Sequence, residues 1–174
     1  MKGKLIAVAA VVLIVVASGG YAIASGMFFP SNGSAAVYIK DPPPANWSAI
    51  YVTITSISIH NSTSGWHSLK MLKPISVNLV DVAVTPELLG SITLPPGHYQ
   101  MIRLNLSGTV SGVYNGKTYS ISLLKTTVFI AGQFTITKGS TTSITLDFNS
   151  AQSIHGTTTT GFTMTPVVGE TVGK

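Results

Sequence analysis

Cysteine is absent from the 174-residue sequence, and charged residues make up only 9% of it. The absence of cysteine excludes disulfides, thiolate metal sites and cysteine nucleophiles. The formal net charge is +5, and it falls to about +3 if Lys2 and Lys4 leave with an N-terminal leader. A charge this diffuse argues against a nucleic-acid interface. We therefore expect no nucleic-acid partner, and a fold that is stabilised by packing.

Acidic residues and histidines are few and scattered. Calcium sites need about six or more oxygen ligands, several of them from carboxylates, and paired histidine ligands need a spacing such as H-x-x-x-H. Neither pattern occurs, and no serine lies in the Gly-x-Ser-x-Gly elbow of a hydrolase. We expect no metal, no cofactor and no enzymatic activity. The residues concerned are Asp41, Asp81, Glu87, Asp147, Glu170, His60, His67, His98 and His155.

The small number of carboxylates also bears on pH. Few groups are present whose protonation would destabilise the folded state in acid. An acidic or hot habitat is therefore our hypothesis, and we expect no sharp loss of structure on acidification to about pH 4, where carboxylates titrate.

The N-terminus has the three-part layout of a secretory signal peptide. Two lysines within the first four residues precede an uninterrupted apolar run over 5–17, and a small-x-small site over 22–24 precedes Ser25. We favour cleavage after residues 1–24. An uncleaved membrane anchor is the alternative, because a hydrophobic helix of about 20 residues spans the bilayer core, and a pilin-type leader is a third. The signal peptide and the anchor both place the folded part outside the cytoplasm.

Residues 25–36 are expected to form a tail before the domain. The tail is rich in small and polar residues, but it contains the apolar trio Met27, Phe28 and Phe29. One interpretation is a spacer whose aromatic rings lie at a membrane interface or pack on the domain. The other is a strand that adds to a sheet edge of a neighbouring subunit.

Residues 37–174 alternate apolar and polar side chains in short runs separated by turns, which predicts a β domain. The clearest run is 94–106, where a Pro-Pro-Gly turn leads into a strand with Ile102, Leu104 and Leu106 on its buried face. We place this strand near the centre of an antiparallel immunoglobulin- or transthyretin-like sandwich of about eight or nine strands.

Three local features are predicted within this domain. A shift in the apolar phase predicts a β-bulge near Thr55 or Ser56. Asn115-Gly116 predicts a tight hairpin. The segment Thr85–Leu89, with proline at its second position, predicts one helical turn.

Several segments resemble a known family. They are Val37-Tyr-Ile-Lys-Asp-Pro-Pro, the run 50–60 before Gly65-Trp66, the segment 94–104, and the segment 146–154 closing on 164–168. In order and spacing these segments resemble the secreted prokaryotic domain of unknown function 4382. The resemblance implies a β-sandwich on exported, often surface-attached proteins and supplies no catalytic residues. Pro43-Pro44 departs from the family pattern and implies a stiffer loop.

Four of the seven asparagines lie in N-x-S/T sequons. We expect these asparagines to lie in loops or on the wet face of strands, where glycans attach. They are Asn32, Asn46, Asn61 and Asn105.

Other side chains suggest contacts that the fold would make. Trp47, Tyr38 and Tyr51 are candidates for an exposed aromatic platform, which would suit a carbohydrate or other ligand. Trp66 is expected in the core. Arg103 and Asp147 are candidates for a cross-strand ion pair.

These observations leave three classes of function open. The first is a structural or adhesive surface protein that self-associates, in one form as a filament subunit assembled by strand donation. The second is a membrane-anchored accessory subunit that binds another envelope protein. The third is a carbohydrate- or ligand-binding module.

Overall fold

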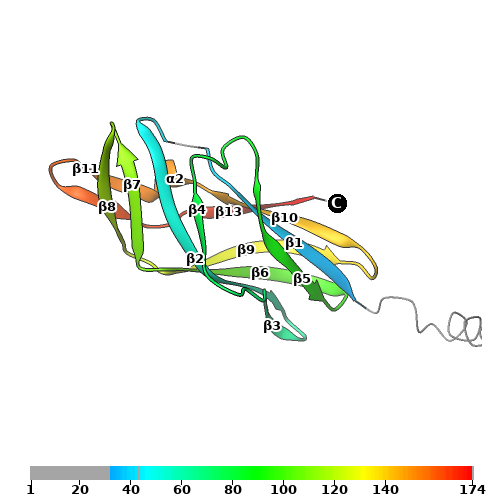
Figure 1. The fold of residues 1–174 in the computed structure, drawn as a ribbon. Helices are drawn as coiled ribbons and strands as arrows, with labels where there is room; N and C mark the ends of the chain where they lie inside the picture. Colours follow the sequence, from blue (N-terminus) through cyan, green and yellow to red (C-terminus); the bar gives the residue numbers. More distant parts are fainter. Residues whose placement is uncertain (1–31, 43, 174) are drawn as a thin grey trace, which may run out of the picture. The chain divides into compact units, whose positions relative to one another are not determined.

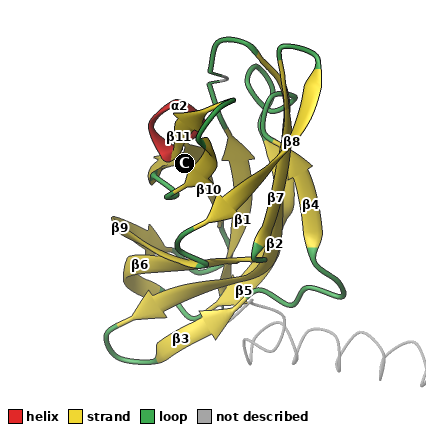
Figure 2. Ribbon diagram, turned by 90° about the vertical axis from the view of Figure 1, so that its left-hand side faces the viewer, coloured by secondary structure: helices red, strands yellow, loops and turns green. Residues whose placement is uncertain are grey.

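The computed structural model describes residues 32–42 and 44–173. Within these residues, thirteen strands and one short helix form two sheets that share one hydrophobic core (Figure 1). Strands account for most of the domain, and the helix α2 (Ser150–Ser153) is the red segment in Figure 2. The predicted leader 1–24 and the trio Met27, Phe28 and Phe29 lie outside the described residues. The all-β class predicted from the sequence is confirmed.

The smaller sheet has four strands. Their order is β13 (Val168–Gly173), β10 (Thr141–Phe148), β1 (Gly33–Lys40) and β5 (Glu87–Leu94). The pairing of β1 with β10 is parallel, and its other neighbour β5 is antiparallel.

The larger sheet has nine strands. Seven lie on one path, in the order β11 (Ile154–Thr157), β12 (Gly161–Met164), β8 (Lys117–Leu123), β7 (Thr109–Tyr114), β2 (Trp47–Asn61), β6 (Gly97–Leu106) and β9 (Thr127–Ile136). The short strands β3 (Gly65–Ser68) and β4 (Ile75–Asn78) also pair with β2. The organising strand is therefore β2, which pairs with four others, and the 94–106 segment that we expected at the centre supplies its neighbour β6.

The prediction of eight or nine strands is too low, and the predicted antiparallel pairing holds for all but two of the described strand pairs. Thirteen strands are present in the described residues, and two pairings are parallel, β1 with β10 and β12 with β8. The strands that the sequence did not predict are β5, β11 and β13, and β11 has only four residues, too few to show an alternating pattern.

The first strand begins earlier than the sequence predicted. It starts at Gly33, so residues 33–36 of the expected tail belong to β1. These small residues resemble a linker, but Ala35 is fully buried, and a Cβ at Gly33 would collide with the backbone oxygen of Thr137. Small side chains are present here because the chain packs closely, not because it is a linker.

The helical turn predicted at Thr85–Leu89 is also wrong. Glu87 instead starts strand β5. The pairing of β5 with β1 shifts register between Val37 and Tyr38, opposite Gly90. Because of this shift, the apolar and polar residues of β5 do not alternate regularly in the sequence. The described helix lies instead at α2, where the side chain of Asn149 accepts a hydrogen bond from the backbone N–H of Gln152 as an N-cap.

Two other local predictions are confirmed. The pairing of β2 with β6 shifts register between Ile54 and Ser56, which is the predicted bulge. Asn115 and Gly116 both have positive φ, at 47° and 75°, and close the β7–β8 hairpin.

Candidate functional site

Four neighbouring strands of the larger sheet present one face to solvent. On the core side of β2, β6 and β9, Ile59, Ile102 and Ile130 are buried. Successive side chains of a strand point to opposite faces, so the alternate residues point outward. The register places outward residues directly across from one another on β3, β2, β6 and β9. We call this surface the aromatic face, and it consists of Trp66, Ser68, Ser58, His60, Met101, Arg103 and Phe129.

Two large rings are exposed on the aromatic face. Trp66 is 38% exposed and Phe129 is 59% exposed. Their ring centroids are 6.3 Å apart, and the ring of His60 lies 4.8 Å from that of Trp66. Neighbouring exposed rings on a sheet face supply apolar contact area that a partner can cover.

Arg103 lies beside these rings. Its guanidinium carbon is 4.6 Å from the centroid of Trp66, and Nη2 donates to Ser58 Oγ at 3.3 Å. The Nε atom is buried and has no hydrogen-bond partner. Within the part of the chain that the structure describes, the one ion pair joins Lys40 to Asp147 at 3.1 Å. The predicted pair of Arg103 with Asp147 is therefore wrong, because β6 and β10 belong to different sheets.

Polar side chains border the aromatic face on one side. Asn105 donates from Nδ2 to Ser56 Oγ at 2.7 Å, and its Oδ1 accepts a hydrogen bond from Thr127 Oγ1 at 2.8 Å. Ser58 and Ser68 share a further hydrogen bond at 3.0 Å. Ser58 itself is only 1% exposed, so the accessible polar groups beside the rings are those of Ser56, Ser68, Asn105 and Thr127.

The aromatic platform predicted from the sequence does not form. Trp47 is only 9% exposed and packs against Tyr114 and Phe162, with ring centroids 5.1 Å and 5.0 Å away. Tyr51 is exposed, but Tyr38 is half-buried on the smaller sheet. The expectation that Trp66 belongs to the core is also wrong. Trp47, predicted to be exposed, is buried, and Trp66, predicted to be buried, is exposed.

The four sequon asparagines differ in exposure. Asn32 and Asn46 are exposed, and Asn46 lies at positive φ in the turn before β2. Asn105 is half-buried beside the aromatic face. Asn61 is 7% exposed, and its Nδ2 donates to the carbonyl oxygen of His98 at 2.8 Å while Oδ1 accepts from two backbone N–H groups. Asn32 and Asn46 are therefore the exposed sequon asparagines of the folded domain.

The described residues contain no group of three or more histidines and acids that could hold a metal ion. Asp41 is nevertheless fully buried at the end of β1. Its Oδ1 accepts a hydrogen bond from the backbone N–H of Ser150 at 2.9 Å, and its Oδ2 has no partner. The pKa of Asp41 is raised to about 6: burial is the largest cause, hydrogen bonding from Ser150 opposes it, and the nearby charge of Asp147 adds to it.

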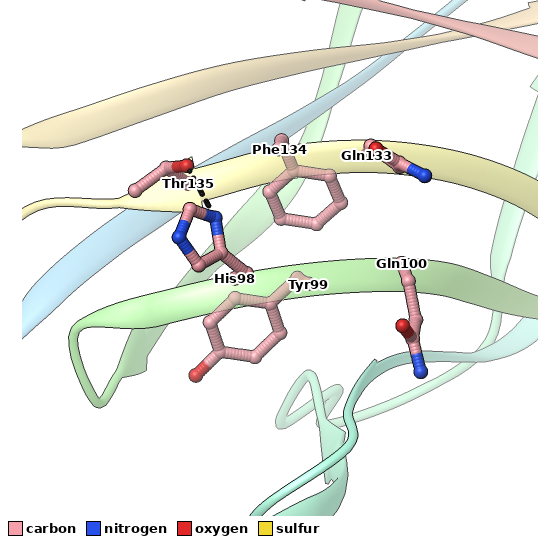
Figure 3. A pocket seen from close by; sticks show the side chains of 6 residues that line it. All are labelled: His98, Tyr99, Gln100, Gln133, Phe134 and Thr135. Atoms are coloured by element: carbon pink, nitrogen blue, oxygen red, sulfur yellow. Dashed lines mark hydrogen bonds between the residues drawn. The ribbon is translucent and has the colours of Figure 1, made fainter.

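A pocket of about 350 Å³ is lined by neighbouring residues of β6 and β9 (Figure 3). The rings of Tyr99 and Phe134 stack there at 5.6 Å, and His98 Nδ1 lies 3.0 Å from Thr135 Oγ1. A second pocket of about 330 Å³ adjoins His98 on the side of the β2–β3 turn. Each pocket contains one histidine and no acidic side chain, so neither assembles an acid–base pair.

Comparison with known proteins places the chain in a family. A family model described as Domain of unknown function (DUF4382) matches residues 32–166. The chain belongs to this family. The resemblance predicted from the sequence is thereby confirmed, and the match begins at the residue before β1 of the DUF4382 domain.

No curated protein matches this DUF4382 protein. Among solved structures, it is similar to a proposed cell adhesion protein from Bacteroides ovatus, at 15% sequence identity and a TM-score of 0.30. The similarity covers 79% of this chain and 43% of the other, so the chain spans less than half the length of that protein.

The aromatic face of the DUF4382 domain was missed from the sequence. Its signal was present in the turn at 61–65, which places His60 directly across from Trp66 once the two strands pair. The alternation of Met101, Arg103 and Asn105 with buried residues of β6 marks the same outward face.

No helix among the described residues is long and apolar enough to span a membrane.

Proposed function

We propose that this chain is an exported, non-enzymatic adhesive domain that holds a partner at the cell surface through its aromatic face. The observation that carries the proposal is the joint exposure of Trp66 and Phe129 beside Arg103. Aromatic residues and arginine are the side chains most enriched at binding surfaces, where a few of them supply most of the affinity.

The N-terminal sequence supports an extracytoplasmic location for this surface. The partner is a second copy of the chain or another component of the envelope. If residues 1–24 are retained as an anchor, the domain is held at the outer face of the membrane and can act as an accessory subunit. N-terminal sequencing of protein from its own cells distinguishes these cases, because a mature chain that begins near Ser25 excludes the anchor.

Attachment of cells that carry the full chain tests the proposal. Wild type, Trp66→Ala and Phe129→Ser are expressed in a host deleted for the native copy, and attachment of the cells to one another and to a surface is measured. We expect both variants to reduce attachment several-fold at equal surface abundance. Tyr51→Ala serves as the control, because Tyr51 is an exposed aromatic residue of β2 outside the aromatic face. Equal attachment by all four strains would reject the proposal.

Strand donation is a second candidate, favoured by the edges of the two sheets. A cavity of about 480 Å³ lies between edge strand β9, the start of β10 and the end of β13. The described chain begins beside it, because the carbonyl oxygen of Asn32 accepts a hydrogen bond from the N–H of Gly139 at 3.0 Å, in the turn between β9 and β10. An apolar strand donated by a neighbouring copy could add to this edge, and the sequence offers Met27, Phe28 and Phe29.

Imaging of native cells tests strand donation. Negative-stain micrographs of cells that carry the wild-type chain are expected to show fibres, and replacement of the three apolar residues by serine should abolish them. Fibres that persist in the variant, or are absent from both strains, would reject donation by this segment.

A further inference from the structure

The proposed function leaves open what the aromatic face binds, and three features of this face narrow the choice. The first is the pair of rings. Trp66 and Phe129 lie on strands separated by β2 and β6, and their rings are tilted by 54° to each other with centroids 6.3 Å apart. Exposed aromatic rings of this kind can stack on the apolar faces of a ligand's rings. Binding sites for small molecules commonly combine such aromatic side chains with a few polar groups.

The second feature is the polarity of the surroundings. The positions around the rings carry serine, asparagine and threonine, including Ser68, Asn105 and Thr127. Among the paired residues that point outward from β3, β2, β6 and β9, Met101 is the one aliphatic side chain larger than alanine. Hydrogen bonds already orient Asn105 and Thr127. Short hydroxyl and amide groups suit a ligand that is itself rich in hydroxyl groups, whereas the core of a protein interface is apolar.

The third feature is charge. Arg103 and His60 lie on the aromatic face, and none of its outward register positions carries Asp or Glu. Arg103 makes no ion pair with any described residue. Its Nε is buried, so a ligand would meet the terminal nitrogens of the half-buried guanidinium. A guanidinium that is stacked on a ring and free of carboxylates can bind an external carboxylate through two parallel hydrogen bonds. One arginine is too little charge for a nucleic-acid backbone, which needs a row of phosphate contacts.

We propose that the aromatic face binds an acidic saccharide, with sugar rings stacked on Trp66 and Phe129 and a carboxylate of the saccharide paired with Arg103. This inference rests on the proposed function, because it names the ligand class of the same surface.

Titration of the purified full-length chain with defined polysaccharides tests the inference. The acidic probe is oligogalacturonate and the neutral probe is dextran, with isothermal titration calorimetry as the readout. We expect saturable binding of oligogalacturonate and none of dextran. Trp66→Ala and Phe129→Ser should each weaken binding at least tenfold, and Tyr51→Ala should leave it unchanged.

The charge contribution is tested separately with Arg103→Gln, which keeps a planar polar group but removes the charge. We expect Arg103→Gln to weaken oligogalacturonate binding about tenfold and to remove most of its dependence on salt concentration. Circular dichroism of each variant shows whether it is folded, and the highly exposed Phe129 gives a variant that does not disturb the core.

The failures of the two proposals are distinguishable. If oligogalacturonate does not bind while Trp66→Ala still abolishes cell attachment, the saccharide inference is overturned and the partner of the aromatic face is a protein. If dextran binds as well as oligogalacturonate, the assigned role of Arg103 is wrong. If neither binding nor attachment depends on Trp66, both proposals fail.

Discussion

The guanidinium of Arg103 lies over the ring of Trp66 on the solvent side of the larger sheet, whereas the other tryptophan, Trp47, packs among aromatic rings inside the domain. The chain therefore contains one tryptophan that serves the core and one that is available to a partner. This division gives the first of four predictions.

Replacement of each tryptophan by alanine should have very different effects on stability. Trp47→Ala removes a buried ring and should lower the free energy of unfolding by about 3–5 kcal/mol. Trp66→Ala removes a ring that is 38% exposed and one cation–π contact, and should cost less, about 1–2 kcal/mol. Urea denaturation of both variants checks the prediction, and similar losses for the two would contradict it.

A matched pair of glycine substitutions tests the packing of Trp47. A Cβ at Gly112 would lie 2.5 Å from the Trp47 ring and 2.8 Å from the backbone oxygen of Ala49, whereas a Cβ at Gly108 meets nothing within 4 Å. Gly112→Ala should therefore lower stability by about 1–3 kcal/mol. Gly108→Ala should change it by less than about 1 kcal/mol. A shift in thermal midpoint for the first variant alone is the expected result.

The buried carboxyl of Asp41 predicts that the domain gains stability on mild acidification. Its pKa in the folded state is about 6, above the value of 3.8 for an ordinary aspartate. The folded state therefore holds this proton more tightly, and the stability contributed by protonation is lost as the pH rises from about 4 to about 6. The difference amounts to as much as about 3 kcal/mol.

Asp41→Asn is the control for this pH effect. Asparagine keeps an oxygen that can accept the hydrogen bond from the N–H of Ser150, but it has no charge to bury. The variant should be more stable than wild type at pH 7 and nearly equal to it at pH 4, as measured by denaturation across this range. A wild-type chain that is less stable at pH 4 than at pH 7, with the same trend in the variant, would contradict this assignment.

Glycan mapping provides the fourth prediction. If the native chain is glycosylated after it folds, glycans should be found at Asn32 and Asn46, because both are exposed. Asn61 should be bare, because its amide nitrogen is bonded to the carbonyl oxygen of His98 inside the domain. Mass spectrometry of intact glycopeptides from native material decides this. A glycan at Asn61 would show that modification precedes folding, and four bare asparagines would end the glycosylation proposal.

The sequence predicted correctly those features that depend only on residues close together in the chain. The bulge near Thr55 appears as a phase shift in one strand, and the hairpin at Asn115-Gly116 follows from the backbone angles that these two residues tolerate. Both are confirmed because neither depends on a distant part of the chain.

The aromatic face could not be placed by such rules. Whether a tryptophan is buried depends on what packs over it, and Trp47 is covered by residues from β7 and β12, which are distant in sequence. The same holds for Arg103, whose neighbour Trp66 is brought to it through β2. Alternation shows that a side chain points outward, but only the strand order shows which outward residues meet.

The parallel pairing of β1 with β10 has a consequence for when the smaller sheet can form. Ser34 and its bonded neighbour Thr141 are 107 residues apart in the sequence. A polypeptide that emerges through a narrow channel, N-terminus first, delivers its opening strand long before the strand that must lie beside it. Contacts this distant slow the search for the native state. In the exported chain that we propose, β1 can therefore pair with β10 only after most of the molecule has crossed the membrane.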